Sequence, residues 1–233
     1  MPFFLAQRDT DSSERMDDPN CDHAELENTY RQFSTINSMI SGWKHIYRKY
    51  IKAEFSARNR SYSLLDIGFG GGDIPLKLAK WAADDGIPLN ITAIETDPRA
   101  VAFVETLNTP DNIQFEHCSS TDLLHRGQQF DVVISNHLLH HLNANQFQNI
   151  LKESKQLSKK KVIFNDLERS DSAYLLFNVF SRPAFRSSFI THDGLTSIKR
   201  SYTLKELKKQ APEDWSVQRL FPFRLLLSYE HVK

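Results

Sequence analysis

The sequence predicts an α/β protein built on a doubly wound, largely parallel β-sheet. Short apolar runs alternate with segments of helical periodicity, a glycine-rich turn follows the first apolar run, and 233 residues suit one domain with a small appendage. Strands that alternate with helices form parallel sheets with helices on both faces, and such sheets bind ligands at the carboxyl ends of their strands. We therefore expect the functional residues at that edge.

The central part of the chain supplies the strands and helices of this sheet. Each expected strand is a short run of mainly branched or aromatic residues, and each expected helix has apolar residues at intervals of three or four. The expected strands are Tyr62–Ile67, Leu89–Glu95, Ile113–Phe115, Phe130–Asn136 and Lys161–Phe164, and the expected helices are Ile74–Ala83, Arg99–Leu107 and Phe147–Leu157.

The N-terminal part divides into two segments. Residues 1–28 are expected to be a flexible, loosely attached leader without a chemical role, because residues 7–28 carry many acids and few large apolar groups. Residues 29–58 predict an N-terminal helical cap, with a possible break at Gly42. Its apolar residues recur at helical spacing: Phe33, Ile36, Ile40, Trp43, Tyr47 and Tyr50.

The α/β domain is expected to span residues 60–233 and to contain a lid inserted after the fifth strand. Residues 168–200 form this lid: the stretch 172–185 is rich in large apolar residues, and the polar stretch Thr191–Gly194 follows it. An insertion of this composition at this position is suited to cover a pocket.

The chain is expected to close with a helix and two strands. The helix covers residues 202–210, and Thr203 with Glu206 three residues later matches a capping box. Residues 217–229 contain Pro222 between two apolar runs, which favours a pair of strands joined by a turn.

Composition indicates an ordinary globular protein with small-molecule rather than nucleic-acid partners. The 29 Lys and Arg residues balance 29 Asp and Glu residues, so the cationic surplus that drives phosphate binding is missing. The two cysteines, Cys21 and Cys118, fit no disulfide or metal-ligand spacing. Since no signal peptide or membrane span is recognisable, we expect a cytoplasmic enzyme.

The turn Asp66-Ile-Gly-Phe-Gly-Gly-Gly-Asp73 distinguishes two classes of ligand. In a dinucleotide loop the third glycine of G-x-G-x-x-G lets the helix pack closely and approach pyrophosphate, but here that position is Asp73. Carboxylates at Asp66 and Asp73 would repel pyrophosphate, whereas they suit a ligand with sulfonium and ammonium groups. Glu95, at the end of the second strand, is placed to accept hydrogen bonds from both hydroxyls of a ribose.

These segments, together with Ala93–Pro98 and Phe130–Leu142, resemble the class I S-adenosylmethionine-dependent methyltransferase superfamily. The resemblance covers roughly residues 60–165 and is nearest to small-molecule enzymes of the ubiquinone and menaquinone type. It implies a Rossmann-like sheet of seven strands with the last strand antiparallel, and S-adenosyl-L-methionine as the methyl donor. The donor-site residues that follow from it and from the loop are Asp66, Gly68, Phe69, Gly70, Glu95, Thr96, Cys118, Ser119 and Asn136.

One departure from the family pattern concerns adenine. The family often has an aspartate that contacts the adenine amino group, and this chain has Cys118-Ser119-Ser120 there. Adenine contacts are then expected from backbone amides and a serine hydroxyl.

Histidines are the expected bases, because methyl transfer to a phenol or enol oxygen requires its proton to be removed. His137, His140 and His141 follow the fourth strand, where the methyl group should lie, and His192 lies in the lid beside Asp193, which could orient it. We select His140, His141 and His192 as candidates, although clustered histidines also pack or cap helices and His192 equally suits a solvated turn.

Other polar groups near the lid have less specific interpretations. Asp166 follows the fifth strand, either as an acid at the active edge or as a helix N-cap. Several cations there either bind an anionic substrate group or only solvate the surface: Arg169, Arg182, Arg186, Lys199 and Arg200. No metal site is expected.

The expected acceptor is a small apolar, aromatic or polyketide-like molecule. The helical cap and the lid lie outside the sheet, where additions to a shared scaffold usually select the substrate. Motifs for nucleobase amines, pyrimidine carbons and arginine are missing after Asn136, which is followed by His-Leu-Leu. An NAD-binding oxidoreductase and a non-catalytic donor-binding partner remain the alternatives.

Overall fold

The computed structural model describes residues 2–55 and 60–231 and shows one sheet of seven strands in the order β3-β2-β1-β4-β5-β7-β6. All neighbouring strands from β3 to β5 are parallel, whereas β7 is antiparallel to both β5 and β6. The predicted sheet with an antiparallel last strand is therefore confirmed. The strands are β1 Tyr62–Ile67, β2 Leu89–Glu95, β3 Ile113–His117, β4 Phe130–Asn136, β5 Ser158–Leu167, β6 Ser216–Leu220 and β7 Arg224–Glu230.

The predicted helices are present with shifted ends, and the lid, for which no helix was predicted, forms the two helices α7 and α8. The structure adds α5, whose six residues are too few for a periodic pattern. The α-helices are α1 His23–Ile40, α2 Trp43–Ile46, α3 Asp73–Asp84, α4 Pro98–Glu105, α5 Ser120–His125, α6 Ala144–Leu157, α7 Asp171–Ala184, α8 Ile190–Arg200 and α9 Leu204–Gln210. Shorter turns are η1 Arg15–Asp17, the π-helical η2 Tyr47–Ile51, η3 Lys52–Glu54 and η4 Leu139–His141.

Two apolar cores fix the sheet between its helices. One cluster packs α2, η2 and α3 against one face, around Trp43, Leu64 and Leu78. The other packs α5, α6 and α9 against the opposite face, around Val133 and Phe147. Because both faces are covered, the edge where the parallel strands end is the place left for a ligand.

The helical cap begins earlier than expected and bends where expected. Helix α1 starts at His23, inside the segment assigned to the leader, because Asp22 accepts a hydrogen bond from the Glu25 amide and caps it. Gly42 adopts a left-handed conformation (φ 71°) and separates α1 from α2. The expected boundary between residues 58 and 60 lies outside the described residues.

The N-terminal segment packs against the lid, contrary to the expectation of a loose attachment. Leu5 is buried against Ala173 and Ile198. The Asp193 carboxylate accepts hydrogen bonds from the backbone amides of Arg15 and Met16, at 2.8 and 3.0 Å. These long-range contacts could not be read from the acidic composition of the segment.

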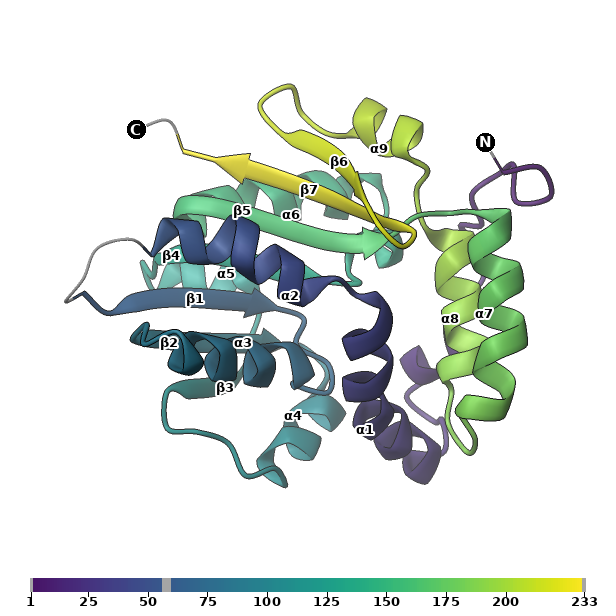
Figure 1. Cartoon of the computed structure of the whole chain (residues 1–233), viewed down its shortest axis with the longest axis horizontal. Coiled ribbons are helices and arrows are strands. Elements are labelled where there is room, and N and C mark those ends of the chain that lie inside the picture. Colours follow the sequence, from purple (N-terminus) through teal and green to yellow (C-terminus); the bar gives the residue numbers. More distant parts are fainter. Residues whose placement is uncertain (1, 56–59, 232–233) are drawn as a thin grey trace.

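The lid is a pair of helices beyond the carboxyl ends of the parallel strands (Figure 1). Helices α7 and α8 pack together closely at Gly194, where a Cβ atom would come within 2.4 Å of the Phe177 ring. The polar stretch Thr191–Gly194, for which a solvated turn was one of two alternatives, lies inside α8 and contains the buried Asp193. Figure 1 also shows α1 between the sheet and this helix pair.

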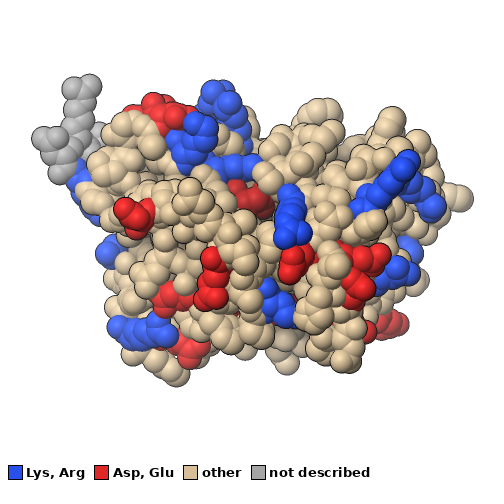
Figure 2. All heavy atoms as spheres, turned by 90° about the horizontal axis from the view of Figure 1, so that it is seen from below, with Lys and Arg blue, Asp and Glu red and all other residues tan. Residues whose placement is uncertain are grey.

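Charged side chains of both signs are interspersed on the face shown in Figure 2. This distribution agrees with the balanced composition. None of the described helices is long and apolar enough to cross a membrane.

Candidate functional site

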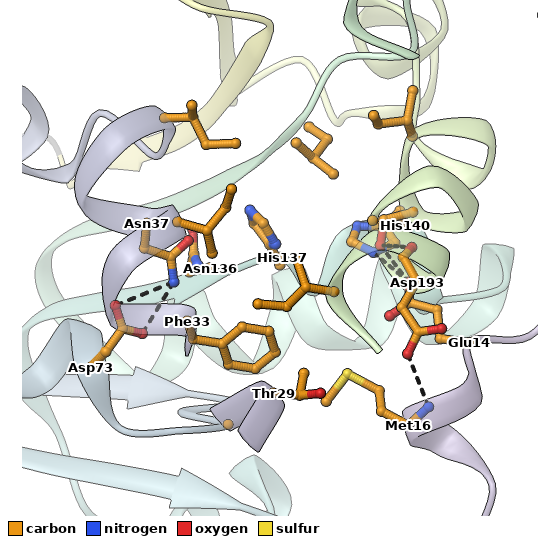
Figure 3. Close-up of a pocket in the computed structure, with 18 of the residues that line it drawn as sticks. Glu14, Met16, Thr29, Phe33, Asn37, Asp73, Asn136, His137, His140 and Asp193 are labelled. Atoms are coloured by element: carbon orange, nitrogen blue, oxygen red, sulfur yellow. Dashed lines mark hydrogen bonds and ion pairs between the residues drawn. The ribbon is translucent and has the colours of Figure 1, made fainter. Parts of the chain in front are cut away.

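A cavity of about 770 Å³ lies where the predicted ligand edge, α1 and the lid meet. The glycine turn and the ends of β2 and β4 line one part of it, and α1, α7 and α8 line the rest. Figure 3 shows Asn37 and Asp73 on one side and Glu14, His140 and Asp193 on the other, with His137 between them. The helical cap and the lid therefore both contribute walls, as their positions suggested.

One wall, the acidic wall, consists of Asp66, Asp73 and Glu95. The side-chain carboxyl group of Asp66 is buried, and its Oδ1 atom has no hydrogen-bond partner. Burial raises the pKa of Asp66 well above its usual range, and the charges of Asp73 and Glu95 raise it further. An unpaired carboxyl of this kind favours a cationic ligand.

The Glu95 carboxylate is oriented by three backbone amides. Its Oε2 atom accepts from Gly70 at 3.2 Å, and Oε1 accepts from Thr96 at 2.7 Å and Asp97 at 3.2 Å. A carboxylate has about four lone-pair sites, of which these amides occupy three, so one site on Oε2 is free. Glu95 is therefore held in place with a free acceptor site for a ribose hydroxyl.

The turn itself depends on glycine at the point where it meets the cavity. Gly70 has φ 52°, a conformation that disfavours residues with a side chain. Asp73, at the start of α3, is paired with Lys77 at 2.7 Å and accepts from Asn37 at 3.1 Å. Asp66 is thus the unpaired acid of this wall, whereas Asp73 has cationic and amide partners.

The other residues predicted to bind the methyl donor fall into two groups, those that line the cavity and those that lie outside its lining. Gly68, Phe69 and Asn136 line the cavity, and the Asn136 side chain accepts from Trp43 Nε1 at 2.9 Å. Three others lie outside its lining: Thr96, Cys118 and Ser119.

The serine that was expected to contact adenine has a local partner instead. Ser119 forms a capping box with Asp122 at the start of α5, and its hydroxyl donates to Asp122 at 2.7 Å. Cys118 is buried, and burial raises the pKa of its thiol. If the Ser119 hydroxyl donated to adenine, its hydrogen bond to Asp122 would have to break.

The opposite wall holds a group that we call the histidine cluster: Glu14, His140 and His141. Figure 3 shows Glu14 beside His140. The three residues come from the N-terminal segment and from η4. Asp166, at the end of β5, accepts from the His140 amide at 3.0 Å and lies 2.7 Å from its Nδ1 atom. Of the two interpretations given for Asp166, the helix N-cap is wrong, because Ser170 caps α7.

His140 is a poor base at neutral pH in this arrangement. Burial lowers its pKa, but the charge and hydrogen bond of Asp166 and the neighbouring Glu14 raise it to about 9. The same contacts lower the pKa of Asp166 and Glu14 against the effect of their burial. His140 thus carries a proton at neutral pH unless another cation replaces it.

The other histidines have distinct environments. His141 is partly exposed, and its two ring nitrogens lie 3.6 Å from Glu14 and 3.5 Å from Asp17. His137 has its Nε2 atom occupied by a hydrogen bond from Arg224, and burial together with that charge lowers its pKa well below the usual value.

His192 does not belong to the cavity lining. Its ring lies 2.9 Å from Asp193, as expected, but its side chain is 45% exposed. The His192 side chain lies outside the cavity because residue 192 is part of helix α8 rather than of a turn. The structure therefore brings His140 and His141 together and leaves His192 apart.

Two of the lid cations stabilise the backbone. Arg169 is buried and donates to carbonyl oxygens of Leu5 and Ser201. Arg200 donates to the carbonyl of His141 at 3.2 Å. These contacts tie the N-terminal segment and η4 to the lid.

Sequence reasoning missed Glu14 and Asp17, because both lie in the segment assigned no role. An acidic leader carries no periodic signal that marks one buried acid among many. The only available signal was that Glu14 and Asp17 are three residues apart, which is weak because the segment contains many acids.

Five large apolar side chains from α1 and α7, which we call the apolar rim, also line the cavity. Phe33 and Met39 of α1 face it, together with Leu176, Phe177 and Phe180 of α7. Phe180 and Met39 are largely exposed at 67% and 71%, so they lie at its mouth. The site therefore combines an acidic wall, a histidine cluster and an apolar rim.

Comparison with known proteins agrees with this geometry. Residues 64–161 match the family model described as a methyltransferase domain. No curated protein sequence matches the chain significantly.

Solved structures share the fold at low sequence identity. The plantazolicin methyltransferase BpumL, in complex with a pentazolic desmethylPZN analogue and SAH, has a TM-score of 0.57 and 13% identity, covering 90% of this chain and 97% of BpumL. Human N-acetylserotonin methyltransferase in complex with SAM has a TM-score of 0.63 and 12% identity, covering 91% of this chain and 57% of that one.

Proposed function

We propose that the chain is a class I S-adenosylmethionine-dependent methyltransferase that methylates a small apolar or aromatic acceptor at oxygen. The single observation that carries donor binding is the unpaired, buried Asp66 carboxyl beside Glu95. A sulfonium and an ammonium group would offset the charge that this wall concentrates.

The residues present fit S-adenosylmethionine group by group. Asp66 and the glycine turn would hold its amino-acid part, since Gly70 leaves the backbone accessible. Glu95, fixed by three amides, would accept from a ribose hydroxyl. When bound, S-adenosylmethionine supplies an electrophilic methyl group on a positively charged sulfur.

The acceptor is proposed to lie between the apolar rim and the histidine cluster. Phe33, Phe177 and Phe180 would bind its apolar body. Its hydroxyl oxygen would point to Glu14, His140 and His141, where the proton is removed before the in-line attack on the methyl group. Such an arrangement suits phenols, quinols and enols.

The shared fold agrees with a small-molecule acceptor. The proteins that share this fold include N-acetylserotonin and plantazolicin methyltransferases. At these identities the likeness supports the scaffold, and the acceptor proposal depends on the cavity.

Isothermal titration calorimetry with S-adenosylmethionine, its demethylated product and NAD tests donor identity. We expect saturable binding of the first two and none of NAD, because Asp73 occupies the position at which a dinucleotide loop has its third glycine. Binding of NAD alone would reject the proposal and favour the oxidoreductase alternative. A screen of phenols and quinols with methyl-labelled donor then separates an enzyme from a non-catalytic donor-binding partner, which would transfer no label.

A further inference from the structure

We propose that Glu14, His140 and His141 bind a divalent zinc ion in the wall of the cavity. The role given to the ion below depends on the proposed methyl transfer, but its binding does not. The inference starts from three side chains, two of them buried, whose ligand atoms all lie within 4.8 Å of one another.

The distances suit one tetrahedral ion. Glu14 Oε1 lies 3.3 Å from His140 Nε2 and 3.6 Å from His141 Nε2. Ligands that bind zinc at about 2.0–2.1 Å in a tetrahedron are separated by about 3.3–3.4 Å. These two separations lie within about 0.3 Å of that value, and the ligand atoms of His140 and His141 lie within 4.8 Å of each other, so an ion fits once the two rings close on it.

Both rings turn the same nitrogen toward this point. Nδ1 of His140 is 2.7 Å from Asp166, and Nδ1 of His141 is 3.5 Å from Asp17, so each ring presents Nε2 to Glu14. Carboxylates that hold the remote nitrogen of a histidine are the usual outer partners of a zinc ligand, because they fix its tautomer and orientation.

The Nε2 atom of His140 supplies an independent observation. It is fully buried and makes no hydrogen bond of acceptable geometry, although it points to Glu14. The contact with Glu14 at 3.3 Å does not supply this hydrogen bond, and coordination of a cation would satisfy the buried nitrogen. Ser197 donates to Glu14 Oε1 at 2.6 Å and fixes the direction of this carboxylate.

The three ligands favour zinc over other metal ions and leave its fourth coordination position open. Two imidazoles and a glutamate form a set used for catalytic zinc, and softer or purely oxygen-binding ions prefer other donors. The three protein ligands line the cavity. The fourth position would therefore be open to the acceptor.

An acceptor hydroxyl at this position would be activated by the ion. Its oxygen binds zinc and releases its proton to solvent water. The resulting oxyanion forms the new O–C bond while the S–C bond of the donor breaks, and the sulfur leaves as a neutral thioether. The N-terminal segment has a chemical role in this scheme, because it supplies Glu14.

Zinc binding to the full chain is the direct test. After treatment with a chelator and dialysis, we expect calorimetry to give one zinc ion per chain with submicromolar affinity. Cobalt(II), which takes the same ligands, should give the intense visible absorption of a tetrahedral site. The variants Glu14→Gln and His141→Asn should each weaken zinc binding by at least about 100-fold, more than the loss of an outer partner.

A control variant and two checks of folding test whether a loss of zinc binding is specific to the site. His125→Ala removes an exposed histidine of α5 and should leave zinc binding unchanged. Unchanged circular dichroism and S-adenosylmethionine affinity in Glu14→Gln and His141→Asn establish that the variants are folded. Absence of saturable zinc binding, or equal affinity in these two variants and the parent chain, would overturn the zinc site. Zinc binding without donor binding would keep the site and reject the methyl-transfer proposal.

Discussion

The imidazole of His140 and the carboxylate of Asp166 are joined across 2.7 Å, and both side chains are almost completely buried. This pair connects η4 with the end of β5. Breaking a buried pair leaves one group without its partner, which costs about 3–5 kcal/mol. We expect Asp166→Asn to lower the free energy of unfolding by about 3 kcal/mol. This value is at the lower end of the range, because His140 can release its proton and so avoid being left as an unpaired buried charge.

Urea denaturation of the protein prepared without metal measures this effect. Asp84→Asn is the matched control, since Asp84 pairs with Lys80 at an exposed site and should change stability by less than about 1 kcal/mol. Equal effects of the two variants would show that the His140–Asp166 pair contributes no more than a surface contact.

Asp66 is expected to reduce stability in the absence of a ligand. Because burial raises its pKa in the folded protein, the folded state keeps a proton that the unfolded state loses above about pH 4. Stability contributed by this group therefore falls as pH rises from about 4 toward the raised pKa.

We expect Asp66→Asn to be more stable than the parent chain at pH 7, by about 1–3 kcal/mol, and equal to it below about pH 4. The same variant should bind S-adenosylmethionine at least tenfold more weakly. Chemical denaturation between pH 4 and 8 gives the first comparison, and a variant that is less stable at pH 7 would show that Asp66 has a partner in the free protein.

Glu95 is expected to account for the ribose contacts. A charge-assisted hydrogen bond contributes roughly 1.5–3 kcal/mol, so Glu95→Ala should weaken donor binding at least tenfold. Glu105→Ala, at the exposed end of α4, is the control and should bind as the parent chain does. An unchanged dissociation constant in folded Glu95→Ala would remove Glu95 from the donor site.

His141 is expected to affect turnover and not donor binding. Replacing it by Gln removes a group from the place where the acceptor oxygen loses its proton, so the turnover number should fall by about 10²- to 10⁴-fold. His192→Gln should retain turnover, because His192 lies outside the cavity lining. If a methyl-transfer assay showed a larger loss of turnover in His192→Gln than in His141→Gln, the acceptor would instead lie at α8.

The sequence predicts most of the sheet because its strands are apolar runs bounded by turns. It also predicts the acidic wall, since Asp66 and Glu95 end two neighbouring parallel strands. Their partners depend on long-range packing: Glu14 is placed by docking of the N-terminal segment on Asp193. The adenine contact expected from Ser119 stays a prediction, because the structure shows only its local capping box with Asp122.

The central claim is that donor and acceptor meet between the acidic wall and the histidine cluster. A crystal structure with the demethylated donor tests it most directly. We predict that the ribose contacts Glu95, that the amino-acid part lies at Asp66, and that the sulfur faces the cavity toward His141. A sulfur atom that faces away from α1, the lid and the histidine cluster would contradict the account.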